Sequence, residues 1–202
     1  MNNAGIPVVG PVEQAPLDEW RRLYETNVFG VVAMAQAVLP QMREAGVGRI
    51  VNIGSVAGRI VAPFFGPYAS SKHAVEGIND GLRRELKPHG VKVSLVRPGF
   101  INTPFGEPEQ AALALYETPD QPYAKQLEIF RAWHAQGHPN APGPMIVAEK
   151  VHHALTAERP HSRYTVPANY IVYLMLRNLL PSALVDRIFE KTNGLDKLES
   201  VK

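Results

Sequence analysis

The segment RIVNIGS (residues 49–55) decides the fold of this chain. Its apolar residues are two isoleucines and a valine, a β-branched run that is typical of a strand buried on both faces of a parallel sheet. Gly54 ends the run, so Ser55 is expected at the carboxyl end of that strand. Ligands of open α/β sheets lie in the crevice beyond these strand ends, which makes the Ser55 hydroxyl a candidate site residue.

A helix is predicted after this strand, from Pro67 to about Leu86. Proline suits the first helical turn, small and apolar residues recur at helical spacing, and Pro88 and Gly90 stop the pattern. The run VKVSLVR (residues 91–97) then predicts a second buried strand. Together these elements form a right-handed βαβ unit with parallel strands.

Tyr68 and Lys72 are four residues apart on the predicted helix, so their side chains share one face. A lysine in the first turns meets the positive end of the helix dipole, which indicates a role other than helix stability. An ammonium beside a phenol lowers the phenol's pKa from about 10, which would make Tyr68 a general acid or base. The alternative is a surface tyrosine beside a solvated lysine, the commoner meaning of so short a motif by itself.

Several motifs occur in an order that resembles the short-chain dehydrogenase/reductase family. They are NNAG (residues 2–5), Asn27, Ser55, the pair Tyr68 and Lys72, and PGFINT (residues 98–103). The resemblance extends from Met1 to about the predicted strand at 163–164, and more loosely to the end. It implies an α/β fold with a Rossmann-type parallel sheet and helices on both faces.

The same resemblance implies the site residues. The catalytic set would be Asn27, Ser55, Tyr68 and Lys72. In this set Tyr68 is the acid/base, Lys72 lowers its pKa and holds the nicotinamide ribose, Ser55 orients and polarises the substrate oxygen, and Asn27 supports a proton relay. Cofactor contacts would come from Asn3, Ala4, Gly5, Tyr68, Lys72, Pro98, Gly99, Ile101 and Thr103. From the residues alone, Asn27 could equally be a satisfied core amide and Thr103 a turn hydroxyl bonded to its own backbone.

The activity that this resemblance implies is reversible hydride transfer between NAD or NADP and a secondary alcohol or ketone. An apolar lid and a strongly apolar helix at 168–180 suggest a lipophilic substrate such as a steroid, a retinoid or a long-chain alcohol. No Gly-x-x-x-Gly-x-Gly turn occurs in the 202 residues, so we expect an amino-terminally incomplete domain whose sheet lacks its first strands. The alternative is an inactive remnant that binds no cofactor and acts only as an interaction or oligomerisation module.

One partial Rossmann-type domain is expected over residues 1–202, with a catalytic core at 1–103, a substrate lid at 104–144 and carboxyl-terminal helices with a last strand at 145–202. A long helix is expected from Leu17 to about Met42. In the lid, residues 123, 127 and 130 share a helical face with Trp133 at its border. This face would wall a pocket or, more commonly, pack into the core.

No metal site is predicted. His134 and His138 have the spacing of a metal pair, but Gly137 and Pro139 break the helix and no third ligand is evident. His152 and His153 are interpreted as surface or helix-interface residues.

The helix at 168–180 is apolar on all sides, which favours burial or a subunit partner over shallow insertion into a membrane interface. The polar tail at 188–202 is expected to fray.

Composition excludes several function classes. The chain has 45% hydrophobic residues, a formal net charge of +2 with scattered basic residues, and no cysteine. These values favour one ordinary globular domain over a nucleic-acid or membrane-surface protein, and they exclude disulfides and thiolate metal sites. No apolar run reaches the roughly 18 residues of a transmembrane helix, and a signal peptide is not expected. A cytoplasmic homo-oligomer acting on a small molecule is therefore expected, with the Leu17 and Tyr68 helices at the subunit interface by family habit.

Overall fold

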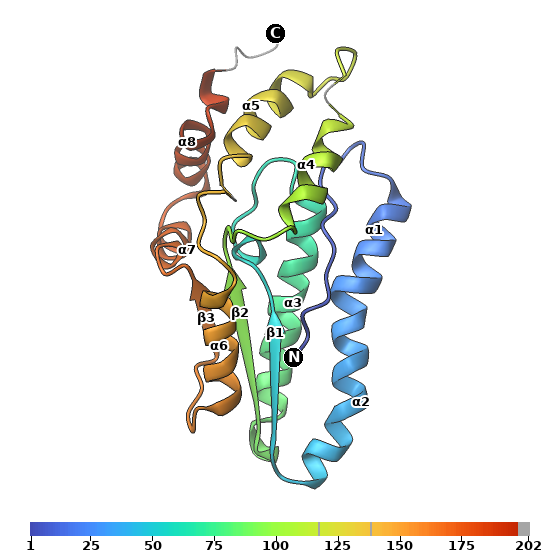
Figure 1. Cartoon of the computed structure of the whole chain (residues 1–202), viewed down its shortest axis with the longest axis vertical. Helices are drawn as coiled ribbons and strands as arrows, with labels where there is room; N and C mark the ends of the chain where they lie inside the picture. The colour runs from blue at the N-terminus through green and yellow to red at the C-terminus, as the bar shows by residue number, and fades with distance from the viewer. Residues whose placement is uncertain (117, 138, 198–202) are drawn as a thin grey trace.

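A three-stranded parallel sheet lies at the centre of the computed structural model, which describes residues 1–116, 118–137 and 139–197 (Figure 1). Its strands are β1 (Gly48–Ile53), β2 (Val91–Pro98) and β3 (Arg163–Val166), in the order β1-β2-β3. Gly48 of β1 lies opposite Val91 of β2, and Leu95 of β2 lies opposite Arg163 of β3. On the outer side of β1, Asn2 donates to the Val51 carbonyl at 2.8 Å and accepts from the Ile53 amide at 2.9 Å.

Helices surround this sheet, and most of them fall where the sequence predicts them. They are α1 (Leu17–Tyr24), α2 (Gly30–Glu44), α3 (Gly66–Glu85), α4 (Gly106–Ala114), α5 (Ala124–His134), α6 (Met145–Thr156), α7 (Tyr170–Leu179) and α8 (Ser182–Asn193). The predicted βαβ unit and the α/β class are confirmed. The expectation of a fraying tail from residue 188 is wrong as far as Asn193, because α8 continues to that residue. Residues 198–202 lie outside the described part.

The two faces of the sheet follow the alternation of side chains along the strands. Ile50 and Val93 point to one face and pack with residues of α2 and α3. Val51 and Val96 point to the other face and pack against α6. Both faces of β1 and β2 are thus buried, which explains why their sequences are nearly continuous apolar runs. Within the described part, none of the helices has both the length and the hydrophobicity to span a bilayer.

A π-helical turn (Glu25–Phe29) interrupts the long helix expected from Leu17. Asn27 lies in this turn and is 1% exposed. Its side-chain oxygen accepts from the Ile6 amide at 2.9 Å, and its Nδ2 donates to the Ile6 carbonyl at 3.0 Å and to Ser71 Oγ at 3.2 Å. Asn27 therefore fastens the amino-terminal segment, which carries NNAG, to helix α3.

A buried ion pair fixes α3 against the sheet. Glu76 of α3 accepts hydrogen bonds from the Nε and the Nη2 of Arg97 on β2, the second at 2.5 Å. The two side chains are 7% and 11% exposed, and Arg163 of β3 lies 3.6 Å from the same carboxylate. Removing one partner of such a pair leaves an uncompensated buried charge.

We expect the substitution Glu76→Ala to lower the free energy of unfolding by about 3 kcal/mol, because it leaves the Arg97 guanidinium buried without its carboxylate. Urea denaturation followed by circular dichroism measures this change. The matched control is Glu85→Ala, an exposed residue of the same helix, which should change the value by less than about 0.5 kcal/mol. Equal effects of the two substitutions would show that the ion pair of Glu76 and Arg97 does not stabilise the fold.

Candidate active site

A cavity of about 1080 Å³ opens beyond the carboxyl ends of β1 and β2. Its lining is mainly apolar, and α3, α6, α7, α8 and the segment around α4 and α5 all contribute to it. The lining includes all the site residues predicted from the sequence except Asn27, namely Asn3, Ala4, Gly5, Ser55, Tyr68, Lys72, Pro98, Gly99, Ile101 and Thr103. The structure therefore gathers at one cavity residues that are up to 100 positions apart in the sequence.

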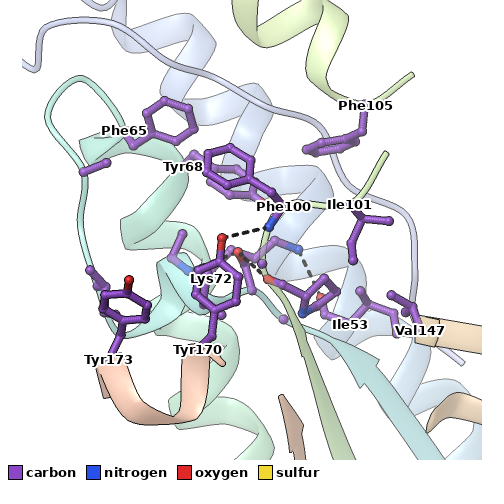
Figure 2. Close-up of a pocket in the computed structure, with 18 of the residues that line it drawn as sticks. Ile53, Phe65, Tyr68, Lys72, Phe100, Ile101, Phe105, Val147, Tyr170 and Tyr173 are labelled. Carbon is purple, nitrogen blue, oxygen red and sulfur yellow. Dashed lines mark hydrogen bonds between the residues drawn. The ribbon is translucent and has the colours of Figure 1, made fainter. Parts of the chain in front are cut away.

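Tyr68 lies near the start of α3 and is 8% exposed. Its ring packs against Phe65 and Phe105, with centroid distances of 6.4 and 6.1 Å (Figure 2). Burial raises the pKa of Tyr68 above its ordinary value, and the nearby carboxylate of Glu109 raises it further, while a hydrogen bond with the Ser55 side chain opposes both. The predicted lowering of this pKa is thus wrong, because desolvation of the phenolate outweighs the other effects.

Lys72 lies one turn further along α3, with its Nζ 5.7 Å from the centroid of the Tyr68 ring. The side chain is buried, and its amine donates to the Ile53 carbonyl at 3.1 Å (Figure 2). Burial lowers the pKa of Lys72 to about 8, because a desolvated ammonium is less stable than the neutral amine. The amine carries more hydrogen-bond donors than this one carbonyl uses, so it has capacity to bind polar groups of a ligand in the cavity.

Ser55 follows β1, as the sequence predicts. Its Oγ accepts from the Ala57 amide at 3.1 Å and donates to the Pro98 carbonyl at 3.4 Å. These contacts hold the hydroxyl between the ends of β1 and β2, where it lines the cavity and interacts with Tyr68.

The turn after β2 is covered by Tyr170 of α7, a residue that the sequence reading did not select. The Phe100 amide donates to the Tyr170 hydroxyl at 3.4 Å, as Figure 2 shows. A Cβ at Gly99 would lie 2.2 Å from a carbon of the Tyr170 ring, so the ring occupies the space above the glycine. Position 170 falls in an apolar helical pattern, and no local signal connects it to a turn some 70 residues earlier.

The α4–α5 region contributes both core and cavity. Leu127 and Phe130 are fully buried in a core cluster, so the shared face predicted for them is mainly a packing face, whereas Trp133 at its border lines the cavity. The region also holds a buried polar pair that the sequence reading missed. His134 Nε2 lies 3.5 Å from Glu109 Oε2, and both residues line the cavity.

The other histidines show no metal arrangement. His138 lies outside the described residues, and in the part that the structure describes no three potential metal ligands come together. His153 is exposed, and its Nδ1 contacts the Tyr164 hydroxyl at 2.8 Å, which places it between α6 and β3. His152 is exposed and lines the cavity.

Comparison with known proteins assigns the family. The family model described as short chain dehydrogenase matches residues 1–114. The NADPH-dependent 3-dehydrocapnine reductase of Ornithobacterium rhinotracheale is 36% identical over 197 residues, which cover 95% of this chain and 68% of the relative. A short-chain dehydrogenase from Streptomyces avermitilis superposes with a TM-score of 0.71 and 27% identity, over 98% of this chain and 70% of the other.

A third similar protein is a 3-oxoacyl-[acyl-carrier protein] reductase with bound NAD from Brucella melitensis. Its TM-score is 0.61 and its identity 30%, over 82% of this chain and 58% of the other. The chain therefore belongs to the short-chain dehydrogenase/reductase family, a family of NAD(P)-dependent oxidoreductases. The predicted resemblance is confirmed.

Hydrogen-bonding groups that could hold the nicotinamide end of such a cofactor lie along the cavity. Gly5 lies close to two polar groups, since a Cβ there would touch Asn27 Oδ1 at 3.4 Å and Lys72 Nζ at 3.7 Å. The amine of Lys72 lines the cavity as a hydrogen-bond donor. The turn at residues 98–103 borders the same cavity, and three of its amides, those of Gly99, Phe100 and Asn102, already donate to groups of the chain.

The depressed pKa of Lys72 makes stability depend on pH. In the folded chain the amine titrates near pH 8 and in the unfolded chain near 10.5, so between these values the unfolded chain binds more protons and stability rises with pH. Relative to the variant Lys72→Met, the wild type should therefore gain about 2 kcal/mol of unfolding free energy between pH 7 and pH 9.5.

Urea titrations at the two pH values measure this difference. The exposed Lys87 provides the control, because a Lys87→Met variant should follow the wild type at both pH values. A wild-type advantage that is constant with pH would show that the amine titrates at its ordinary pKa.

Proposed function

We propose that this chain catalyses reversible hydride transfer between NAD or NADP and a secondary alcohol or ketone. The observation that carries the proposal is the convergence of Ser55, Tyr68 and Lys72 on one apolar cavity. The bound cofactor would supply or accept the hydride. The protein then has to orient the substrate oxygen, move one proton and exclude water.

Tyr68 would be the group that moves the proton. Its raised pKa keeps the phenol protonated at neutral pH, which suits donation to the oxygen of a ketone as that oxygen gains negative charge. The opposite direction, oxidation of an alcohol, requires the phenolate, which the buried site disfavours. The site would therefore be better suited to ketone reduction than to alcohol oxidation.

Ser55 and Lys72 would assist in different ways. The Ser55 hydroxyl interacts with Tyr68 and lies at the end of β1, so it would donate a hydrogen bond to the same substrate oxygen and help to position it. Lys72 would bind the ribose hydroxyls of the cofactor and, when protonated, would stabilise the phenolate that remains after proton donation.

Asn27 would act from behind the cavity. Its side chain is engaged by Ile6 and Ser71, so we assign the side chain to holding NNAG beside α3, with the relay role left to the backbone near it. The cofactor contacts proposed for Asn3, Ala4, Gly5, Pro98, Gly99, Ile101 and Thr103 are supported by their place in the lining of the cavity.

The proposal also covers the substrate class, the oligomeric state and the cellular location. The cavity's volume and apolar lining support a lipophilic substrate, over which residues 104–144 would form a lid and α7 a side wall. Exposed apolar side chains at Leu17, Phe29 and Met34 support pairing of copies through the α1–α2 surface, as in a homo-oligomer. We place the activity in the cytoplasm, with a small-molecule partner and no nucleic acid.

Replacement of Tyr68 by Phe is expected to reduce kcat about 10²- to 10⁴-fold, because it deletes the proton that the ketone oxygen receives and keeps the ring. Turnover is followed by the absorbance of NADPH or NADH with a panel of apolar ketones. A Tyr24→Phe variant, changed outside the cavity, serves as control and should retain wild-type turnover. Survival of activity in Tyr68→Phe would disprove the assignment of the acid/base.

Cofactor binding separates this proposal from the inactive-remnant alternative. Titration of NADH or NADPH into the purified chain, followed by nicotinamide fluorescence, should show saturable binding that Lys72→Met weakens. An absence of saturable binding with both dinucleotides would favour the remnant.

A further inference from the structure

Helices α7 and α8 expose an unusual amount of apolar surface. Side chains between 43% and 76% exposed form what we call the α7–α8 face, which consists of Ile171, Val172, Tyr173, Met175, Leu176, Leu179, Leu184 and Ile188. Of the residues of α7, Leu174 is buried. Of the two alternatives favoured for this helix, burial is therefore wrong, and a subunit partner stays a prediction. An exposed patch of this kind marks an interaction site.

The apolar arc of α7 carries no charge. With about 100° between successive residues, Val172, Met175 and Leu179 project from the same side of the helix and are its most exposed side chains. The charged residue of α7, Arg177, lies on the opposite side of the helix, roughly 170° from the middle of this arc, and the helix has no acidic residue. An uncharged apolar side opposite a cation is typical of amphipathic helices that lie in a membrane interface.

The charges of α8 are ordered around its own apolar stripe. The helix carries three pairs of exposed residues, and the two members of each pair are four positions apart. Leu184 and Ile188 form the apolar pair, Arg187 and Lys191 the basic pair, and Asp186 and Glu190 the acidic pair. On the helical wheel the basic pair lies next to the apolar pair, about 60° away, whereas the acidic pair lies about 160° away. The apolar stripe is thus accompanied by positive charge, which complements an anionic lipid surface.

The same surface contributes to the lining of the cavity. Tyr173, Leu176 and Ile188 belong to the α7–α8 face and also line the cavity. Figure 1 shows α7 and α8 at the side of the molecule opposite to α1 and α2.

We propose that the α7–α8 face docks on a membrane surface that contains anionic lipid. The apolar side chains would enter the interface, Arg187 and Lys191 would lie at the headgroups, and the part of the cavity that α7 and α8 line would face the acyl chains. The further consequence, that a lipophilic ketone enters from the bilayer, rests on the proposed function. The docking itself does not depend on catalysis.

The test is cosedimentation of the purified 202-residue chain with sucrose-loaded vesicles. Vesicles of phosphatidylcholine mixed with phosphatidylserine should sediment the protein, and vesicles of phosphatidylcholine alone should sediment less of it. The double variant Val172→Glu with Leu179→Glu should bind at least about tenfold more weakly, because two of the most exposed apolar groups of the face no longer leave water. The charge variant Arg187→Glu with Lys191→Glu should lose the preference for phosphatidylserine.

The matched control changes two similarly exposed valines elsewhere, Val12→Glu with Val47→Glu, and should bind as the wild type does. Circular dichroism verifies that every variant is folded. The proposal is overturned if the wild type stays in the supernatant with both vesicles, or if Val172→Glu with Leu179→Glu sediments unchanged. It is also overturned if light scattering shows a dimer that the same double variant dissociates, since the face then pairs two copies.

Failure of docking and failure of catalysis give different results. The vesicle assay contains no cofactor or ketone, so the variant Tyr68→Phe should sediment like the wild type even when it is inactive. A chain that reduces ketones in solution but ignores vesicles would retain the proposed function and lose only the docking surface.

Discussion

The desolvation of two ionisable side chains on α3 is the constraint on which the site depends. Tyr68 and Lys72 lie one turn apart with almost no access to water, and burial moves their pKa values in opposite directions. Both shifts favour the neutral forms, so burial disfavours the ion pair of phenolate and ammonium at this site.

This arrangement requires that α3 be held firmly, and three different interactions hold it. The carbonyl of Ile53 receives the Lys72 amine at the end of β1. Asn27 joins α3 to the amino-terminal segment through Ser71, and Glu76 joins it to β2. In each of them a buried polar group is bonded to a partner from a distant part of the chain. Such bonds fix one position of α3, and substitution of either partner leaves the other buried without a bond.

Much of the fold and of the site could be predicted from the sequence, because the signals are local. The β-branched run of β1, the proline that opens α3 and the four-residue spacing of Tyr68 and Lys72 each report on structure within a few residues. The order of the motifs then identified the family and, with it, the cavity-lining residues. The direction of the Tyr68 pKa could not be predicted, because it depends on how completely α4 and α5 exclude water from the phenol.

The features that were missed depend on contacts between distant segments. Glu109 and His134 meet across two helices, and neither residue has a neighbour in sequence that indicates the pairing. The π-helical turn around Asn27 is hidden in a continuous helical pattern, since one extra residue in a turn barely changes the apolar spacing. The exposure of α7 could not be predicted either, because an apolar helix has the same composition whether it is covered or not.

The contact between Gly99 and Tyr170 has a consequence for how this sequence can diverge. The ring lies so close to the glycine that even alanine at position 99 would collide with it. A side chain at 99 therefore requires that the Tyr170 ring turn aside, or that α7 lose the aromatic ring or shift away from the turn. The two positions are bound to vary together, so among homologues a larger residue at one should coincide with a smaller residue at the other.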